Sequence, residues 1–75
     1  MPPTFRDLRR YCERDRWTLL RSTDRWIYEK VLPDGRVLRT QVSRAVHREI
    51  PRGLWERILK HQLQIREEDF WKKVR

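Results

Sequence analysis

The chain contains a single cysteine, Cys12, so it cannot form an internal disulfide. A lone cysteine in a chain this short is typical of a reducing compartment, and we expect a cytoplasmic protein. Free cysteines are usually buried, and Cys12 lies one helical turn after Leu8. We therefore interpret it as a core thiol and not as a nucleophile.

Long apolar runs are also missing from the sequence. No stretch approaches the roughly 20 apolar residues that a membrane-spanning helix needs. The first three residues, Met-Pro-Pro, lead directly into charged sequence, without the apolar stretch of a signal peptide. We expect neither membrane insertion nor secretion.

Acidic residues are outnumbered by basic ones. The 75 residues include 19 lysines and arginines against 11 aspartates and glutamates, which gives a net charge of +8. Nearly all of the positive charge is arginine, whose planar guanidinium binds phosphates bidentately and stacks on bases. This excess favours RNA or DNA as a partner. The alternative is a charged, solvated surface without a nucleic-acid role.

The first part of the chain predicts a helix followed by three strands in a single domain, residues 1–75. Thr4 caps the helix, Asp7 is its capping-box acid, and the helix ends near Arg14. Alternating side chains predict strands at 17–20, 25–32 and 36–42. The last two strands are joined by a Pro-Asp-Gly turn.

Two helices complete the predicted fold. After a polar loop at 43–49, a helix runs over 51–62, and a short final helix begins with the acidic residues 67–69, which suit a helix N-terminus. The fold class is therefore α+β. We expect a three-stranded antiparallel sheet with the helices on one face and the other face open.

The start of the second predicted helix is a candidate anion site. Pro51 suits the first helical position, and Gly53 allows a phosphate to approach the backbone closely. Free N–H groups, the helix dipole and the side chains of Arg52 and Arg57 all attract negative charge there. The buried stripe of this helix is predicted to consist of Leu54, Ile58, Leu59 and Leu63.

Five segments in this order resemble the HicA family of toxin–antitoxin toxins. They are Trp-Thr-Leu-Leu-Arg at 17–21, Ser-Thr-Asp at 22–24, Pro-Asp-Gly-Arg at 33–36, Ile-Pro-Arg-Gly at 50–53 and Glu-Glu-Asp-Phe at 67–70. The resemblance implies a double-stranded-RNA-binding-domain-like α-β-β-β-α fold. It also implies an endoribonuclease (mRNA interferase) that needs no metal or cofactor and is neutralised by a HicB-like antitoxin.

One departure from the family pattern concerns catalysis. HicA-like proteins carry their catalytic histidine where this chain has Asp24, between Arg21 and Arg25. Asp24 is either a catalytic carboxylate or a turn residue that bonds its own backbone. His47, in the following loop, is either a substitute proton-transfer group or an exposed loop residue.

The remaining candidates are RNA contacts. Arg21, Arg25 and Arg39 are predicted to line the open sheet face or its edge. Arg52, Arg57 and Lys60 are predicted on the second helix, where this fold meets phosphates. Trp26 or Trp55 either stacks on an unpaired base or packs in the core.

Three functions remain open from the sequence. The first is a HicA-like RNA-binding endoribonuclease, with Asp24 or His47 moving the proton. The second is a catalytically inactive RNA-binding module on the same fold. The third is a protein-interaction domain that meets an acidic partner through a strand or its tryptophans.

Overall fold

The computed structural model describes residues 2–75, which form three helices, a π-helical segment and a three-stranded sheet. The first helix, α1 (Phe5–Arg14), begins as predicted at Thr4. The Thr4 side chain accepts a hydrogen bond from the Asp7 N–H, and the Asp7 carboxylate accepts one from the Thr4 N–H. This capping box fixes the start of α1.

The sheet contains β1 (Thr18–Ser22), β2 (Arg25–Val31) and β3 (Val37–Ser43). Both neighbouring pairs are antiparallel, in the order β1-β2-β3, so β1 and β3 are the two edges. A bulge interrupts β1 between Leu19 and Arg21. The β2–β3 turn is the predicted one, with Gly35 at a φ of 91°, which glycine adopts without strain.

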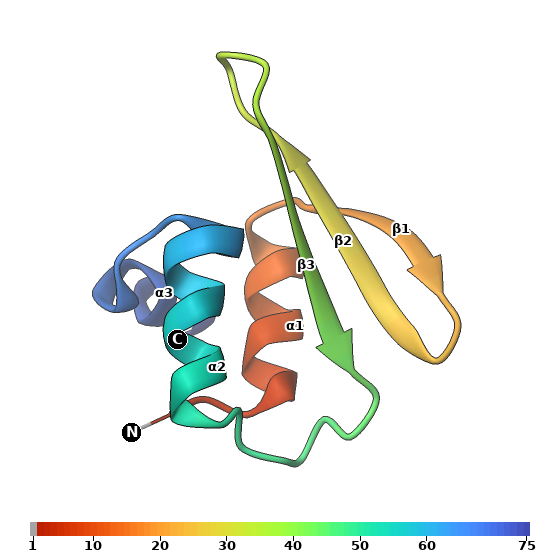
Figure 1. Cartoon of the computed structure of the whole chain (residues 1–75), viewed down its shortest axis with the longest axis vertical. Helices are drawn as coiled ribbons and strands as arrows, with labels where there is room; N and C mark the ends of the chain where they lie inside the picture. The colour runs from red at the N-terminus through yellow and green to blue at the C-terminus, as the bar shows by residue number, and fades with distance from the viewer. Residues whose placement is uncertain (1) are drawn as a thin grey trace.

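The helices pack against one face of the sheet, and Figure 1 shows β3 as the strand nearest to α1 and α2. Alternate side chains of β2 and β3 face these helices and are buried. The predicted α+β class, with a three-stranded antiparallel sheet between helical segments, is confirmed. Among residues 2–75, fourteen buried apolar side chains form the core, including the fully buried Phe70 and Leu8.

The second helix differs from its prediction in three ways. It consists of α2 (Arg52–Arg57) followed by a π-helical segment, η1 (Ile58–Leu63), and ends at Gln64 in a left-handed conformation. Pro51 precedes the helix with an extended backbone (ψ 141°), so the prediction of a helical Pro51 was wrong.

The predicted buried stripe was also wrong at two positions. Trp55, not Leu54, enters the core, where its ring meets Phe70 edge-on at 4.7 Å between centroids. Leu54 is 40% exposed and Leu59 is only partly buried, whereas Ile58 and Leu63 are buried as predicted. The large indole ring takes the inward position, and the wider π turn then sets which later residues face the core.

The last helix, α3 (Glu67–Val74), begins with the acidic residues predicted for its first turn. Phe70 and Val74 are buried, and Trp71 is partly exposed, as predicted. The Phe70 ring stacks on Tyr11 of α1 at 5.2 Å, which joins the two helices.

Candidate nucleic-acid interface

The open face of the sheet carries three of the predicted arginines. Arg21 lies opposite Ile27, and Arg39 lies opposite Glu29. Because alternate residues of a strand share a face, and the buried residues of β2 and β3 face the helices, these arginines and Arg25 point to the other side. The structure therefore brings Arg21, Arg25 and Arg39 together from all three strands.

The charges on this face are only partly neutralised. Arg39 donates to Glu29 across the strands at 2.9 Å. Arg25 donates to the neutral Oε1 of Gln41 at 2.9 Å. Among residues 2–75, neither Arg21 nor Arg25 has a carboxylate within 4.0 Å. The face is thus a positive surface whose guanidinium groups can bind phosphates.

The three basic residues predicted on the second helix lie in the helical layer and not on the open sheet face. Arg52 is exposed and lies 3.8 Å from Glu56. Arg57 and Lys60 are exposed too, with no carboxylate within 4.0 Å in the described part of the chain. No side chain caps the first N–H groups of α2. The predicted basic residues therefore form two separate sets.

Trp26 occupies the core side of β2, where its ring is only 8% exposed. The guanidinium carbons of Arg9 and Arg44 each lie 4.0 Å from the ring centroid. These two cation–π contacts, together with burial, leave the ring no free face for a base. Of the two alternatives for Trp26 and Trp55, the structure supports core packing, because both indole rings are buried.

The two catalytic candidates lie in loops at the same end of the sheet. Asp24 is exposed in the β1–β2 turn, where its Oδ1 accepts a hydrogen bond from Thr23 at 3.1 Å. His47 is exposed in the β3–α2 loop. Arg44, from that second loop, donates to the Thr23 carbonyl at 2.9 and 3.1 Å, so the loops are held together. No hydrogen bond joins Asp24 and His47 among the described residues.

A groove of about 930 Å³ runs between β3 and the second helix. Its lining includes two of the predicted arginines, Arg25 and Arg39, and one that the sequence did not single out, Arg48. Ile27, Leu54 and Ile58 provide apolar surface in the same groove. The groove therefore combines positive and apolar walls beside an edge strand.

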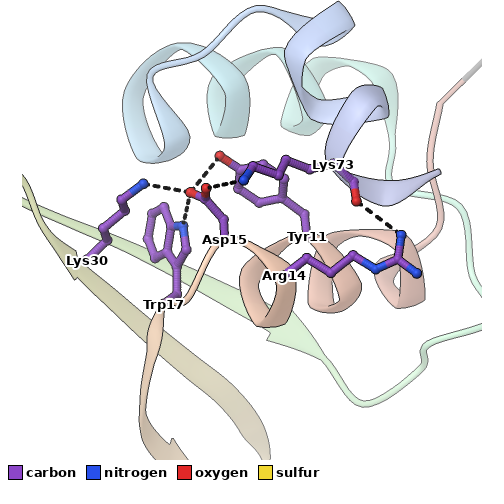
Figure 2. A network of polar contacts seen from close by, with 6 residues as sticks. All are labelled: Tyr11, Arg14, Asp15, Trp17, Lys30 and Lys73. Carbon is purple, nitrogen blue, oxygen red and sulfur yellow. Dashed lines mark hydrogen bonds and ion pairs between the residues drawn. The ribbon is translucent and has the colours of Figure 1, made fainter.

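Asp15 binds four side chains from different parts of the fold (Figure 2). Its Oδ2 accepts from Lys30 at 2.7 Å and from Tyr11 and Trp17 at 3.1 Å, and its Oδ1 lies 3.5 Å from Lys73. Burial alone would raise the pKa of Asp15, but the hydrogen bonds and the charge of Lys30 lower it on balance. This network positions the sheet against the helices.

Arg14 fixes the end of α3 beside the Asp15 network (Figure 2). One of its terminal nitrogens, Nη1, donates to the carbonyl oxygens of Lys73, Val74 and Arg75 at 3.1, 2.6 and 3.1 Å. These are carbonyls that a helix end leaves without internal partners. Arg14 therefore serves the fold and is not part of the open basic face.

Cys12 and the possible metal ligands are further candidate reactive groups among the described residues. Burial, with the nearby charges of Asp15 and Glu13, raises the pKa of Cys12, so this fully buried thiol stays protonated. Within residues 2–75, no three His, Cys, Asp or Glu side chains are grouped as metal ligands. No helix in the same range is long and apolar enough to cross a membrane.

Nothing in the sequence indicated a role for Arg44, Arg48 or Arg9. All three look like ordinary charged residues between apolar positions, and no local spacing connects Arg9 or Arg44 with Trp26. Their roles depend on contacts between residues distant in the chain. No local signal could have identified them.

No protein-family model, curated protein or solved structure matches this chain. What the interface can do is therefore inferred from its geometry and from the residues themselves.

Proposed function

We propose that this protein binds RNA by contacting phosphates with the open face of its sheet. The observation that carries the proposal is the convergence of Arg21, Arg25 and Arg39 on one face, two of them without a carboxylate partner. Guanidinium groups bind phosphate oxygens through paired, charge-assisted hydrogen bonds. A net charge of +8 adds long-range attraction to a polyanion.

The HicA-like assignment belongs to the same proposal. The order helix, three antiparallel strands, helix, together with the Pro-Asp-Gly-Arg turn between β2 and β3, supports a double-stranded-RNA-binding-domain-like scaffold. Toxin activity and a HicB-like antitoxin partner rest on the resemblance of the motifs. An affinity measurement with such an antitoxin, if one is encoded beside this protein, tests that part.

The test of RNA binding compares two single substitutions that remove one positive charge each. Arg21 lies on the open face, whereas Lys72 lies on α3, and both are exposed without a carboxylate within 4.0 Å in the described chain. Arg21→Ala is expected to weaken binding of all RNA sequences alike and to reduce the salt slope by about 0.7. Lys72→Ala should leave both quantities nearly unchanged.

Fluorescence anisotropy with single-stranded and duplex oligoribonucleotides, at several salt concentrations, measures both effects. Equal losses in the two variants would mean that only total charge matters and would contradict a specific face. Absence of binding at low salt would reject RNA as the partner.

Endoribonuclease activity is a second candidate function, favoured by one observation. Arg44 holds the turn that contains Asp24 against the loop that contains His47, so both proton-transfer candidates lie at one end of the basic face. If RNA is cleaved in EDTA, His47→Ala should lower the rate by at least about 100-fold, the usual contribution of a general acid or base. Unchanged cleavage in both His47→Ala and Asp24→Ala would exclude these residues.

A further inference from the structure

The β3 edge of the sheet has backbone groups without partners. The Leu32 N–H donates to the Arg36 carbonyl at 2.8 Å, which makes these two residues a hydrogen-bonded pair of the hairpin. The register is regular from there to the pair Arg25 and Ser43. Because hydrogen-bonded and non-bonded pairs alternate, the N–H and C=O groups of Arg39 and Gln41 point away from β2. No turn, loop or side chain of the described residues forms a hydrogen bond with them.

The surroundings of this edge differ on its two sides. The open sheet face presents Arg25 and Arg39 to the groove, and Arg48, from the loop between β3 and α2, also lines it. The second helix presents Leu54 to the same groove, with the almost fully buried Ile58 also in its lining, and Leu54 is the exposed apolar side chain that the sequence had placed in the core. The open-face side therefore carries arginines with Ile27 beside them, the helix side is apolar at Leu54, and Glu49 is the one carboxylate among the described lining residues.

A strand added to this edge would meet both sides at once. Its alternate side chains would point to opposite faces of the sheet, one set towards the arginines and the other towards Leu54 and Ile58. We infer that the open edge of β3 binds an extended segment of a protein partner, with alternating acidic and apolar residues, as a fourth strand. Backbone hydrogen bonds would hold the segment, and the alternation would give its specificity.

The groove is lined by three arginines and one carboxylate, Glu49, and this positive excess argues for an acidic partner over a second copy of this chain. Two copies paired through β3 would bring arginine-bearing edges together, and a basic residue on an edge strand opposes such self-pairing. Each copy also carries a net charge of +8. A carboxylate on the added strand would instead meet Arg25, whose present partner is the neutral Gln41 amide.

RNA fits the groove less well than an extended peptide. A ribose-phosphate chain carries no alternating backbone donors and acceptors to match the N–H and C=O groups of Arg39 and Gln41. The apolar wall at Leu54 and Ile58 also offers nothing to a phosphate. The inference goes beyond the proposed RNA binding and does not depend on it, although Arg25 and Arg39 belong to both surfaces.

The probe is a dye-labelled hexapeptide in which glutamate and valine alternate, with capped ends. The matched control is a block peptide with three glutamates followed by three valines, which has the same composition and charge. The alternating peptide is expected to bind at least about tenfold more tightly, because only it can direct charge and apolar groups to opposite faces. Amide hydrogen exchange by NMR should slow at Arg39 and Gln41 when it binds.

Two matched substitutions distinguish binding at the β3 edge from non-specific apolar binding elsewhere on the surface. Leu54→Ser should weaken the alternating peptide by about fivefold, since a partly buried leucine loses apolar contact. Leu20→Ser removes a similarly exposed leucine (45%) from the other edge strand and should change nothing. Leu54 contacts no phosphate in the proposed RNA surface, so RNA affinity should be equal in the two variants.

Three results would overturn the inference. The first is equal affinity for the alternating and block peptides, and the second is unchanged exchange at Arg39 and Gln41 in the bound state. The third is slowed exchange of these amides with an oligoribonucleotide but not with peptide, which would assign the groove to RNA. Loss of RNA binding in Arg21→Ala with peptide binding intact would leave the inference supported and show the two surfaces to be separate.

Discussion

At the residue scale, Asp15 connects side chains from four parts of the fold. Its carboxylate accepts hydrogen bonds from Tyr11 in α1, from Trp17 just before β1 and from Lys30 in β2, and it faces Lys73 in α3. The side chain is only 13% exposed. A carboxylate removed from water in this way needs all of its partners, because an unpaired buried charge is costly.

Replacing Asp15 tests this role. Asp15→Asn removes the charge that balances Lys30 and is expected to lower the free energy of unfolding by about 2 kcal/mol, the value of charge-assisted hydrogen bonds. Urea unfolding followed by tryptophan fluorescence measures the loss. Asp34→Asn is the control, because Asp34 pairs with Arg36 at the exposed hairpin turn and its loss should matter far less. Equal losses in the two variants would contradict a special role for Asp15.

The same carboxylate predicts how stability depends on pH. The pKa of Asp15 is lowered in the folded chain, since the hydrogen bonds and charge of Lys30 outweigh burial. A lowered pKa means that the unfolded chain binds the proton more readily. The stabilisation is therefore complete above about pH 4, near the unfolded pKa, and is lost as the pH falls through the folded pKa. Unfolding free energies between pH 6 and pH 2 should fall less steeply in Asp15→Asn than in the wild type.

At the scale of elements, the second helix shows which features the local spacing of apolar residues predicts and which it does not. Its position and its buried residues Ile58 and Leu63 were predicted correctly, because apolar spacing carries that information. The π-helical turn and the inward side chain of Trp55 were not predicted, because local spacing shows neither the change in helix type nor the contact of the Trp55 ring with Phe70. The exposure of Leu54, on which the peptide groove depends, follows from the same packing.

Gly53 gives a test of the anion site that the sequence predicts at the start of this helix. A methyl group on Gly53 would meet no atom within 4 Å, so Gly53→Ala should stabilise the protein by about 0.5–1 kcal/mol. RNA affinity should remain unchanged, because the proposed contacts lie on the sheet. Weaker RNA binding in this variant would indicate that the phosphate binds at the start of α2 and not on the sheet.

Thermal unfolding measures the stability of the Gly53→Ala variant, and Gly35→Ala is its matched control. Gly35 has a φ of +91°, a conformation that alanine adopts only with strain, so this variant should lose about 1 kcal/mol or more. The change in the free energy of unfolding is therefore expected to be positive for Gly53→Ala and negative for Gly35→Ala. A loss of stability in both would contradict the helical backbone at Gly53.

At the scale of the whole molecule, charge is distributed unevenly. Two partly buried acidic residues serve the fold, Asp7 in the capping box of α1 and Asp15 in its network. Several arginines of the sheet and of the β3–α2 loop, among them Arg21, Arg25 and Arg48, are left without a carboxylate within 4.0 Å in the described residues. The positive charge of these arginines is therefore available to a partner, because it is not paired with carboxylates of the protein itself.

The salt dependence of RNA binding follows from this distribution. With about four phosphate contacts, the logarithm of affinity should fall against the logarithm of salt with a slope near −2.8 for single-stranded RNA. Affinity then decreases about 50-fold between 50 and 200 mM salt. Anisotropy titrations over that range measure the slope. A slope near zero would show that phosphates are not the main contact.

The sequence alone determined the order of helices and strands in this protein and its excess of positive charge. Capping boxes, turn residues and apolar periodicity act over a few residues, so Thr4, Gly35 and the strand alternation could be read without a structure. Tertiary structure decided which groups meet. It placed Trp26 between Arg9 and Arg44, gathered arginines from three strands on one face and left Leu54 beside an unpaired edge, because packing depends on residues far apart in the chain.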